Sequence, residues 1–165
     1  MGVDEWREMI VDLGFLDECF TQREVTLCFV WARLRSHDEQ SEKGWRKTTN
    51  LSFEDFLEAF VRVATMKSLP TDEMIEAAGA ADAGEFLLSM QDDDPAEHHA
   101  FVAANQRQWD DGVNGKLGQP VARCVDHLCM LMVRTVKSTS GMPESAQKLA
   151  ITRKESVAFD LVRGG

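Results

Sequence analysis

The sequence predicts an all-α fold, and three observations lead to that class. Apolar residues recur at three- and four-residue intervals through much of residues 1–137, which is the period of an amphipathic helix. Helix-start signals, in which a hydroxyl or carboxylate cap precedes an acidic residue by three positions, stand at Thr21, Ser52 and Asp94. No segment shows the strict alternation of polar and apolar residues that is typical of a half-buried strand.

Length and charge bound the domain organisation and the class of partner. The chain has 165 residues, and we expect residues 1–137 to form one helical domain and residues 138–165 to form a linker and an extended or partly helical tail. The 18 Lys and Arg residues are outnumbered by 28 Asp and Glu residues, so the net charge is -10. An acidic surface disfavours nucleic acid and anionic membranes and favours basic protein partners.

Four cysteines indicate the compartment. They lie within apolar patterns and lack the short-loop spacing of a disulfide framework: Cys19, Cys28, Cys124 and Cys129. Reduced thiols of this kind predict a cytoplasmic protein. The sequence shows neither a signal-peptide pattern nor an apolar run long enough to cross a bilayer, so we expect no direct membrane insertion.

The first two helices are predicted by their apolar faces and by one capping box. Residues 3–13 place four apolar side chains on one face, and Gly14 is a plausible stop. Thr21 and Glu24 can satisfy each other's backbone N–H groups, so they predict a helix that runs from there to about Arg35. The apolar residues of the first face are Trp6, Met9, Ile10 and Leu13.

A long polar stretch separates these helices from the next one. Residues 36–50 lack an apolar period and predict a loop, in which Trp45 either fixes the loop to the core or acts as a binding anchor. Ser52 then caps a helix from about Phe53 to Lys67, with Asp55 as the acid of its capping box.

The C-terminal half predicts further helices that pack on this pair. A helix begins after Thr71 and extends through Met90, with Gly79 and Gly84 as possible breaks. Asp94 and Pro95 open a helix that runs to about Trp109. Residues 121–137 form the most apolar helix, which is too short and too interrupted to span a bilayer and is expected to be central and buried.

An internal repeat relates the two capped helices. An apolar residue, a hydroxyl cap, an acid three positions after the cap and the apolar residues that follow recur at a spacing of 31 positions. The chain from Val3 to Thr65 therefore resembles an EF-hand pair, of the divergent kind seen in EF-hand-like proteins of flagellated and ciliated protists. The resemblance implies that Phe20 and Leu51 pair through their backbones and that the protein belongs to a flagellar or other cytoskeletal assembly. The two aligned segments are Phe20-Thr21-x-x-Glu24-Val25-x-x-x-Phe29-Val30 and Leu51-Ser52-x-x-Asp55-Phe56-x-x-x-Phe60-Val61.

The loops of this pair depart from the pattern that calcium requires. Calcium needs about six or more oxygen ligands at fixed loop positions, ending in a bidentate Glu. In the first loop only Asp17 and Glu24 could serve, and in the second Gly44 and Arg46 occupy the first and third positions while Asp55 replaces the Glu. We therefore expect neither loop to bind calcium. The glycine-rich turn 110–118 also lacks the anchoring carboxylate and is interpreted as an ordinary connection between helices.

Other motifs support neither a metal nor an enzyme. Cys124, His127 and Cys129 resemble a zinc pattern only partly, because Cys129 lies off the shared helix face and no fourth ligand is near in sequence. No phosphate-binding loop, nucleophile elbow or catalytic pair of side chains is evident. We expect no cofactor and no catalytic activity.

These observations predict a protein–protein interaction or structural subunit of a larger complex. Its apolar groove would accept a basic or amphipathic partner helix, with an acidic rim that attracts it. A calcium-regulated sensor and a subunit of a large organellar or membrane complex are the alternatives. The groove is expected to comprise Phe29, Trp31, Phe53, Phe56, Phe60 and Met66, with Trp45 as a further candidate for contact.

Overall fold

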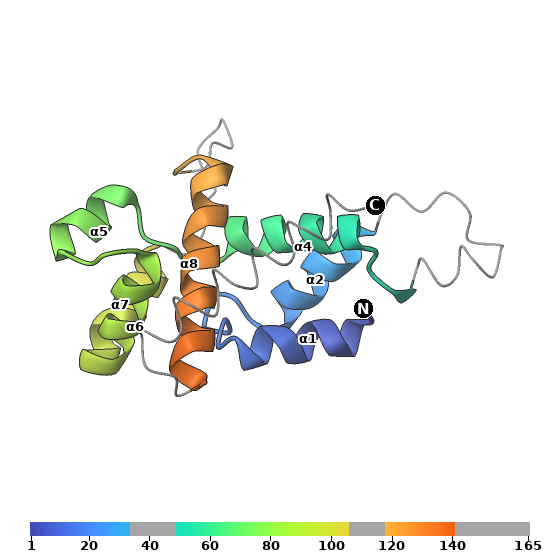
Figure 1. The fold of residues 1–165 in the computed structure, drawn as a ribbon, viewed down its shortest axis with the longest axis horizontal. Helices are drawn as coiled ribbons and strands as arrows, with labels where there is room; N and C mark the ends of the chain where they lie inside the picture. The colour runs from blue at the N-terminus through green and yellow to red at the C-terminus, as the bar shows by residue number, and fades with distance from the viewer. Residues whose placement is uncertain (34–48, 106–117, 141–165) are drawn as a thin grey trace, which may run out of the picture.

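The computed structural model describes residues 1–33, 49–105 and 118–140, and Figure 1 shows its fold. Within these ranges every regular element is a helix, and the extended structure is limited to an isolated bridge between Gly2 and Asn50. The prediction of an all-α fold is therefore confirmed. The helices are α1 (Val3–Asp12), α2 (Gln22–Ala32), α4 (Phe53–Met66), α5 (Asp72–Ala78), α6 (Ala83–Asp93), α7 (Pro95–Ala104) and α8 (Val121–Thr139).

The predicted helix starts are confirmed by their capping hydrogen bonds. The backbone N–H of Thr21 donates to the Glu24 carboxylate at 3.0 Å, and the N–H of Ser52 donates to the Asp55 carboxylate at the same distance. The Asp94 carboxylate accepts from two backbone N–H groups of the first turn of α7. These contacts are local, so sequence alone could locate them.

Several helix ends differ from the prediction. Helix α2 ends at Ala32 rather than near Arg35, and α7 ends at Ala104 rather than near Trp109. Helix α8 continues to Thr139, so the linker expected from residue 138 begins within a helix. The turn at 110–117 and the tail beyond 140 lie outside the described residues.

The two glycines predicted as possible breaks have different roles. Gly79 ends α5 with φ 69°, a left-handed conformation that glycine adopts without steric cost. Gly84 lies instead in the first turn of α6 and is buried. A Cβ there would lie 2.8 Å from the carbonyl oxygen of Met130, so the absence of a side chain allows α6 to approach α8 closely.

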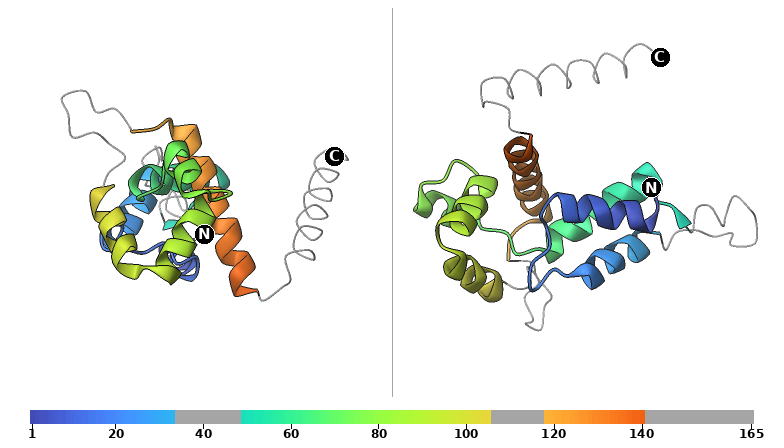
Figure 2. Two further views of the ribbon diagram at one scale, coloured as in Figure 1. Left: turned by 90° about the vertical axis from the view of Figure 1, so that its left-hand side faces the viewer. Right: turned by 90° about the horizontal axis from the view of Figure 1, so that it is seen from below.

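Helix α8 is central to the packing. It packs against α4 on one side and α6 on the other, while α2 packs between α1 and α4. Figure 1 shows α8 standing across the molecule, with α1, α2 and α4 on one side and α5, α6 and α7 on the other. The right-hand view of Figure 2, from below, shows the same division. Among the described helices none is both long and apolar enough to cross a bilayer.

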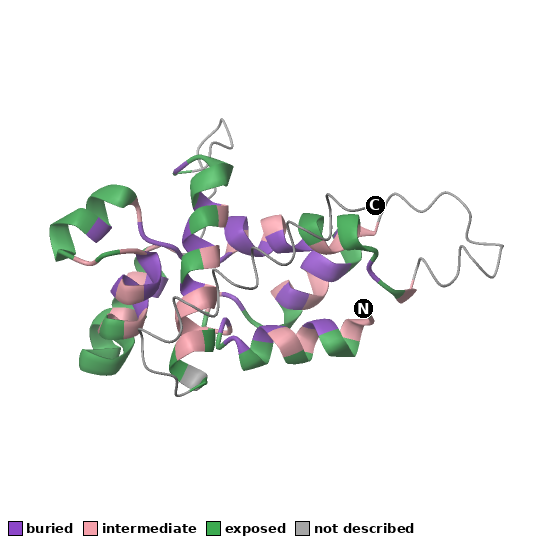
Figure 3. Cartoon of the chain, viewed as in Figure 1, coloured by how far each residue is buried: buried purple, intermediate pink, exposed green. Residues whose placement is uncertain are grey.

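The core lies where these helices face one another, as the burial colours in Figure 3 show. The Trp6 ring is fully buried and its indole N–H donates to the Val25 carbonyl at 2.9 Å, which ties α1 to α2. The Phe56 ring meets Trp6 edge-on at 6.0 Å and thereby adds α4 to the same cluster.

The backbone pairing expected from the EF-hand resemblance is wrong. The N–H of Leu51 donates to the Met1 carbonyl at 2.8 Å, and the Leu51 carbonyl accepts from the amino group of Met1. The N–H and carbonyl of Phe20 both bond to Asp17 within their own turn. Because the backbone groups of Phe20 and Leu51 are already paired elsewhere, they do not join these two segments to each other.

Candidate functional site

The structure divides the predicted groove residues between core and surface. Phe29 is 1% exposed and Phe60 is 8% exposed, so both belong to the hydrophobic core and do not line an open groove. Phe56 and Met66 are half-buried and pack against that core. This part of the prediction is wrong because α2 and α4 pack directly on each other and cover the residues that the pattern had assigned to a partner.

The remaining predicted residues lie at the surface or outside the described ranges. Trp31 is 40% exposed and Phe53 is 74% exposed, on α2 and α4 respectively. Neither is among the residues that line the groove described next. Trp45 lies outside the described residues, so its role as anchor or loop contact stays a prediction.

A different groove runs between α1 and the C-terminal end of α8. Its volume is about 550 Å³, and Figure 1 shows the two helix segments that form its walls. The α1 wall carries Glu5, Glu8 and Asp12 above an apolar floor of Met9 and Leu13. The carboxylates recur at three- and four-residue spacing, so they form one acidic edge along the helix.

The burial of the opposite face of α1 fixes this orientation. Trp6 and Ile10 are both fully buried on the core side, so the residues between them in the helical repeat turn outward. Glu5 is held further because it accepts from the backbone N–H of Gly2 at 2.8 Å. The acidic edge therefore lies on a helix whose rotation is determined by the core.

The α8 wall adds apolar and hydroxyl groups. It consists of Thr135, Val136 and Ser140, and Val136 is 53% exposed. Arg134 on the same turn faces away from the groove, toward α6, where its guanidinium donates to Asp82 at 2.7 Å and to Glu85 at 3.0 Å. The charge of Arg134 is thus neutralised within the fold, and the described residues that line the groove include acids but no base.

The acids at the presumed calcium-ligand positions have other partners. The Asp17 carboxylate accepts from the backbone N–H groups of Cys19 and Phe20 and from the ammonium of Lys67 at 2.9 Å. Lys67 also donates to the Phe15 carbonyl at 2.8 Å, and the side chains of Lys67 and Asp17 are each only 8% exposed. The Lys67 ammonium therefore lies beside Phe15 and Asp17, two residues of the loop that the EF-hand resemblance implies.

The pKa values of these acids follow from the same contacts. Burial raises the pKa of Asp17, but the charge and hydrogen bond of Lys67 outweigh it, so the net shift is downward. The Thr21 hydroxyl lowers the pKa of Glu24. Within the described residues no group of three or more His, Cys, Asp or Glu side chains is arranged to hold a metal ion.

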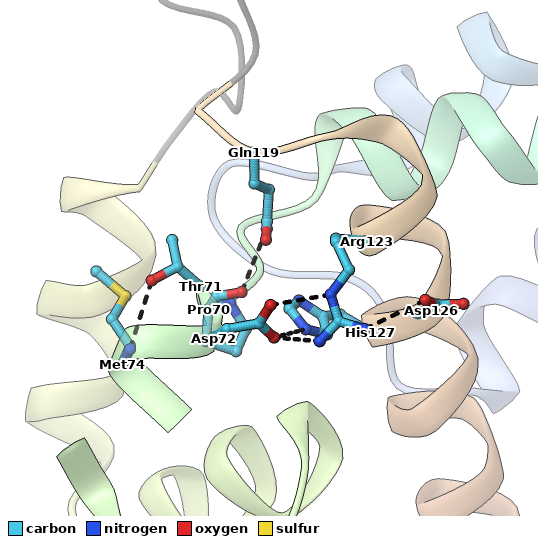
Figure 4. Close-up of polar contacts among 8 residues, drawn as sticks. All are labelled: Pro70, Thr71, Asp72, Met74, Gln119, Arg123, Asp126 and His127. Atoms are coloured by element: carbon cyan, nitrogen blue, oxygen red, sulfur yellow. Dashed lines mark hydrogen bonds and ion pairs between the residues drawn. The ribbon is translucent and has the colours of Figure 1, made fainter. Parts of the chain in front are cut away.

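The zinc-like motif on α8 is part of a contact with α5, shown in Figure 4. The His127 ring lies 3.1 Å from the Asp72 carboxylate through Nε2, and Arg123 pairs with the same carboxylate. The Arg123 hydrogen bond lowers the pKa of Asp72. The Asp72 cluster, defined as Asp72, Arg123, Asp126 and His127, thus fixes the start of α5 against α8. Cys124, on the same helix, is fully buried.

Sequence reasoning missed the groove for two reasons. The acidic spacing of Glu5, Glu8 and Asp12 was visible, but the α1 helix was interpreted only through its apolar face. The second wall, on α8, lies more than 120 positions further along the sequence, counting from Asp12 to Thr135. No local sequence pattern indicates that α1 and the end of α8 lie side by side. Lys67 was likewise interpreted only as a helix end, although its partner Asp17 lies 50 positions away.

Comparisons with known proteins identify no relative of this chain. No family model, no curated protein and no solved structure matches the chain.

Proposed function

We propose that this protein is a non-catalytic protein–protein interaction subunit that binds a basic amphipathic helix in the groove between α1 and α8. The observation that carries the proposal is the groove itself, in which Glu5, Glu8 and Asp12 border an apolar floor and none of the described lining residues is basic. A helix with apolar residues on one face and Lys or Arg at its edges complements that surface in shape and charge.

Calcium independence is part of the proposal. The ammonium of Lys67 and the capping N–H groups already satisfy Asp17, and Ser52 engages Asp55 in the same way. These contacts engage the acids of the first loop and of the end of the second loop without a metal ion. The groove is then present at resting calcium, as a constitutive structural subunit would require.

The assembly that contains the subunit is proposed from the sequence resemblance alone. Similarity to EF-hand-like proteins of flagellated and ciliated protists suggests a cytoplasmic cytoskeletal or flagellar complex. The four thiols agree with a reducing compartment, because none of them forms a disulfide in the described residues. The net charge of -10 adds long-range attraction for a basic partner.

A pair of designed peptides tests the proposal on the full chain. One peptide is an amphipathic Leu/Lys helix, and its control carries Glu in place of each Lys. We expect fluorescence anisotropy to detect binding of the basic peptide alone, with the same Kd in calcium and in chelator. Binding of both peptides with equal affinity, or binding only with calcium, would contradict the proposal.

Matched charge reversals locate the site. The groove variant carries Glu8→Lys and Asp12→Lys, and the control carries Glu76→Lys and Asp93→Lys on exposed positions of α5 and α6. Both variants change the net charge equally. We expect the groove variant to weaken binding by about tenfold, and the control by about twofold or less. Equal losses would show that binding depends on net charge and not on the groove.

A further inference from the structure

A second, more enclosed space adjoins the groove, with which it shares Leu13 and Thr135. It has a volume of about 180 Å³ at the junction of the α1–α2 connection with α6, α7 and α8. Its wall combines aliphatic residues, such as Leu87, Leu88 and Leu131, with polar residues, such as Lys67 and His98. A more open surface depression adjoins it, and the two share Leu16, Asp17, Gln91, His98 and Val102.

Two polar side chains in this cavity have hydrogen-bonding capacity to spare. The Lys67 ammonium has three N–H donors, and its partners are the Phe15 carbonyl and the Asp17 carboxylate. One donor therefore remains on a side chain that is 8% exposed and lines the cavity. His98 lines the same cavity, and its ring makes no hydrogen bond to any described residue.

The protonation state of His98 determines which hydrogen bonds its ring can make. Burial lowers the pKa of His98, and the nearby Lys67 ammonium lowers it further. The ring is therefore neutral at pH 7 and presents one donor and one acceptor nitrogen. Since Asp17 already balances Lys67, an additional negative charge in the cavity would have no counter-ion.

Water alone suits this cavity poorly. A volume of 180 Å³ corresponds to about six water molecules at roughly 30 Å³ each. Each buried water needs about two to four polar partners, and the aliphatic side chains of the wall, such as Leu87, Leu88 and Leu131, supply none. By contrast, an apolar cavity of similar size, about 150 Å³, accepts a benzene-sized molecule.

We propose that the cavity binds a compact, neutral alcohol with an apolar ring about the size of benzene. The hydroxyl oxygen accepts from the free N–H of Lys67, and the hydroxyl proton is donated to the ring of His98. The ring of the ligand packs among the leucine side chains. This site adjoins the proposed helix-binding groove at Leu13 and Thr135, but the proposal does not depend on the helix-binding function.

The probe is benzyl alcohol, with benzoate and toluene as chemical controls. We expect methyl-resolved NMR of the full chain to show NOEs from the benzyl alcohol ring to Leu87, Leu88 and Leu131. Benzoate is expected not to bind at pH 7, because its charge would be buried beside Asp17. Absence of these NOEs, or equal binding of benzoate, would overturn the proposal.

Two variants test the site and the hydroxyl contact separately. Leu88→Phe fills the cavity and is expected to weaken benzyl alcohol binding at least about tenfold, whereas Leu57→Phe on the exposed face of α4 changes nothing. Lys67→Met is expected to weaken benzyl alcohol about tenfold and toluene by less than about twofold. Equal losses for the two ligands would reject the Lys67 contact. If Lys67→Met does not fold, the Leu88→Phe result and the wild-type NOEs still decide whether the cavity binds.

Discussion

Lys67 and Asp17 form an ion pair at 2.9 Å that joins the end of α4 to the connection between α1 and α2. Each side chain is 8% exposed, so the pair is largely withdrawn from solvent. The same ammonium also donates to the Phe15 carbonyl, and the same carboxylate caps two backbone N–H groups. One contact therefore organises the whole turn from Phe15 to Phe20.

Removing one partner of this pair should destabilise the protein strongly. We expect Asp17→Asn to lower the free energy of unfolding by about 3 kcal/mol, because it leaves the Lys67 charge buried without a counter-charge. The double variant Asp17→Asn with Lys67→Met is expected to be less damaging than the sum of the two single changes. Urea denaturation of the four proteins measures this coupling, and strict additivity would show that the pair contributes nothing.

The same pair predicts a dependence on acid. The pKa of Asp17 is lowered in the folded state, so its contribution is complete above the unfolded pKa of about 3.9 and is lost as the pH falls through the lower folded value. We expect the stability difference between wild type and Asp17→Asn to be constant near pH 7 and to shrink below about pH 4. Denaturation at several pH values measures that difference. A gap that stays constant down to pH 2.5 would contradict the downward shift.

Gly84 should not tolerate a side chain. Gly→Ala in a helix normally stabilises by about 1 kcal/mol. Here the added Cβ would lie 2.8 Å from the Met130 carbonyl oxygen and 3.0 Å from the Leu131 Cα, and backbone atoms cannot move aside cheaply. We therefore expect Gly84→Ala to destabilise by about 1–3 kcal/mol. Thermal unfolding checks the sign, with Ser89→Ala on the exposed face of α6 as the control that is expected to be nearly neutral.

The two phenylalanines that the sequence placed in one groove should behave differently. Phe60 is buried and stacks with Phe56 at a centroid distance of 6.2 Å, so Phe60→Ala is expected to cost about 3–5 kcal/mol. Phe53 is 74% exposed, and Phe53→Ala is expected to change stability by no more than about 0.5 kcal/mol. Chemical denaturation separates these outcomes. Similar losses for both variants would mean that the Phe53 ring is also covered in solution.

The sequence by itself determined the fold class and most helix starts. The capping pairs Thr21 with Glu24 and Ser52 with Asp55 lie three residues apart, and the core faces follow from helical periodicity. Interactions of this range are set locally, so they can be inferred without knowing the rest of the fold. The same local information could not show whether an aromatic face such as that of Phe29 would meet a partner or another helix of the chain.

Tertiary structure decided which of these faces remained available. Packing of α2 on α4 buried Phe29 and Phe60, and the approach of α1 to the end of α8 created the acidic groove instead. It also joined Lys67 to Asp17 and Asp72 to Arg123, pairs separated by 50 and 51 positions. The physical reason is that apolar burial is not directional: periodicity specifies that a face will be covered, but the covering element is selected by the packing of the whole chain.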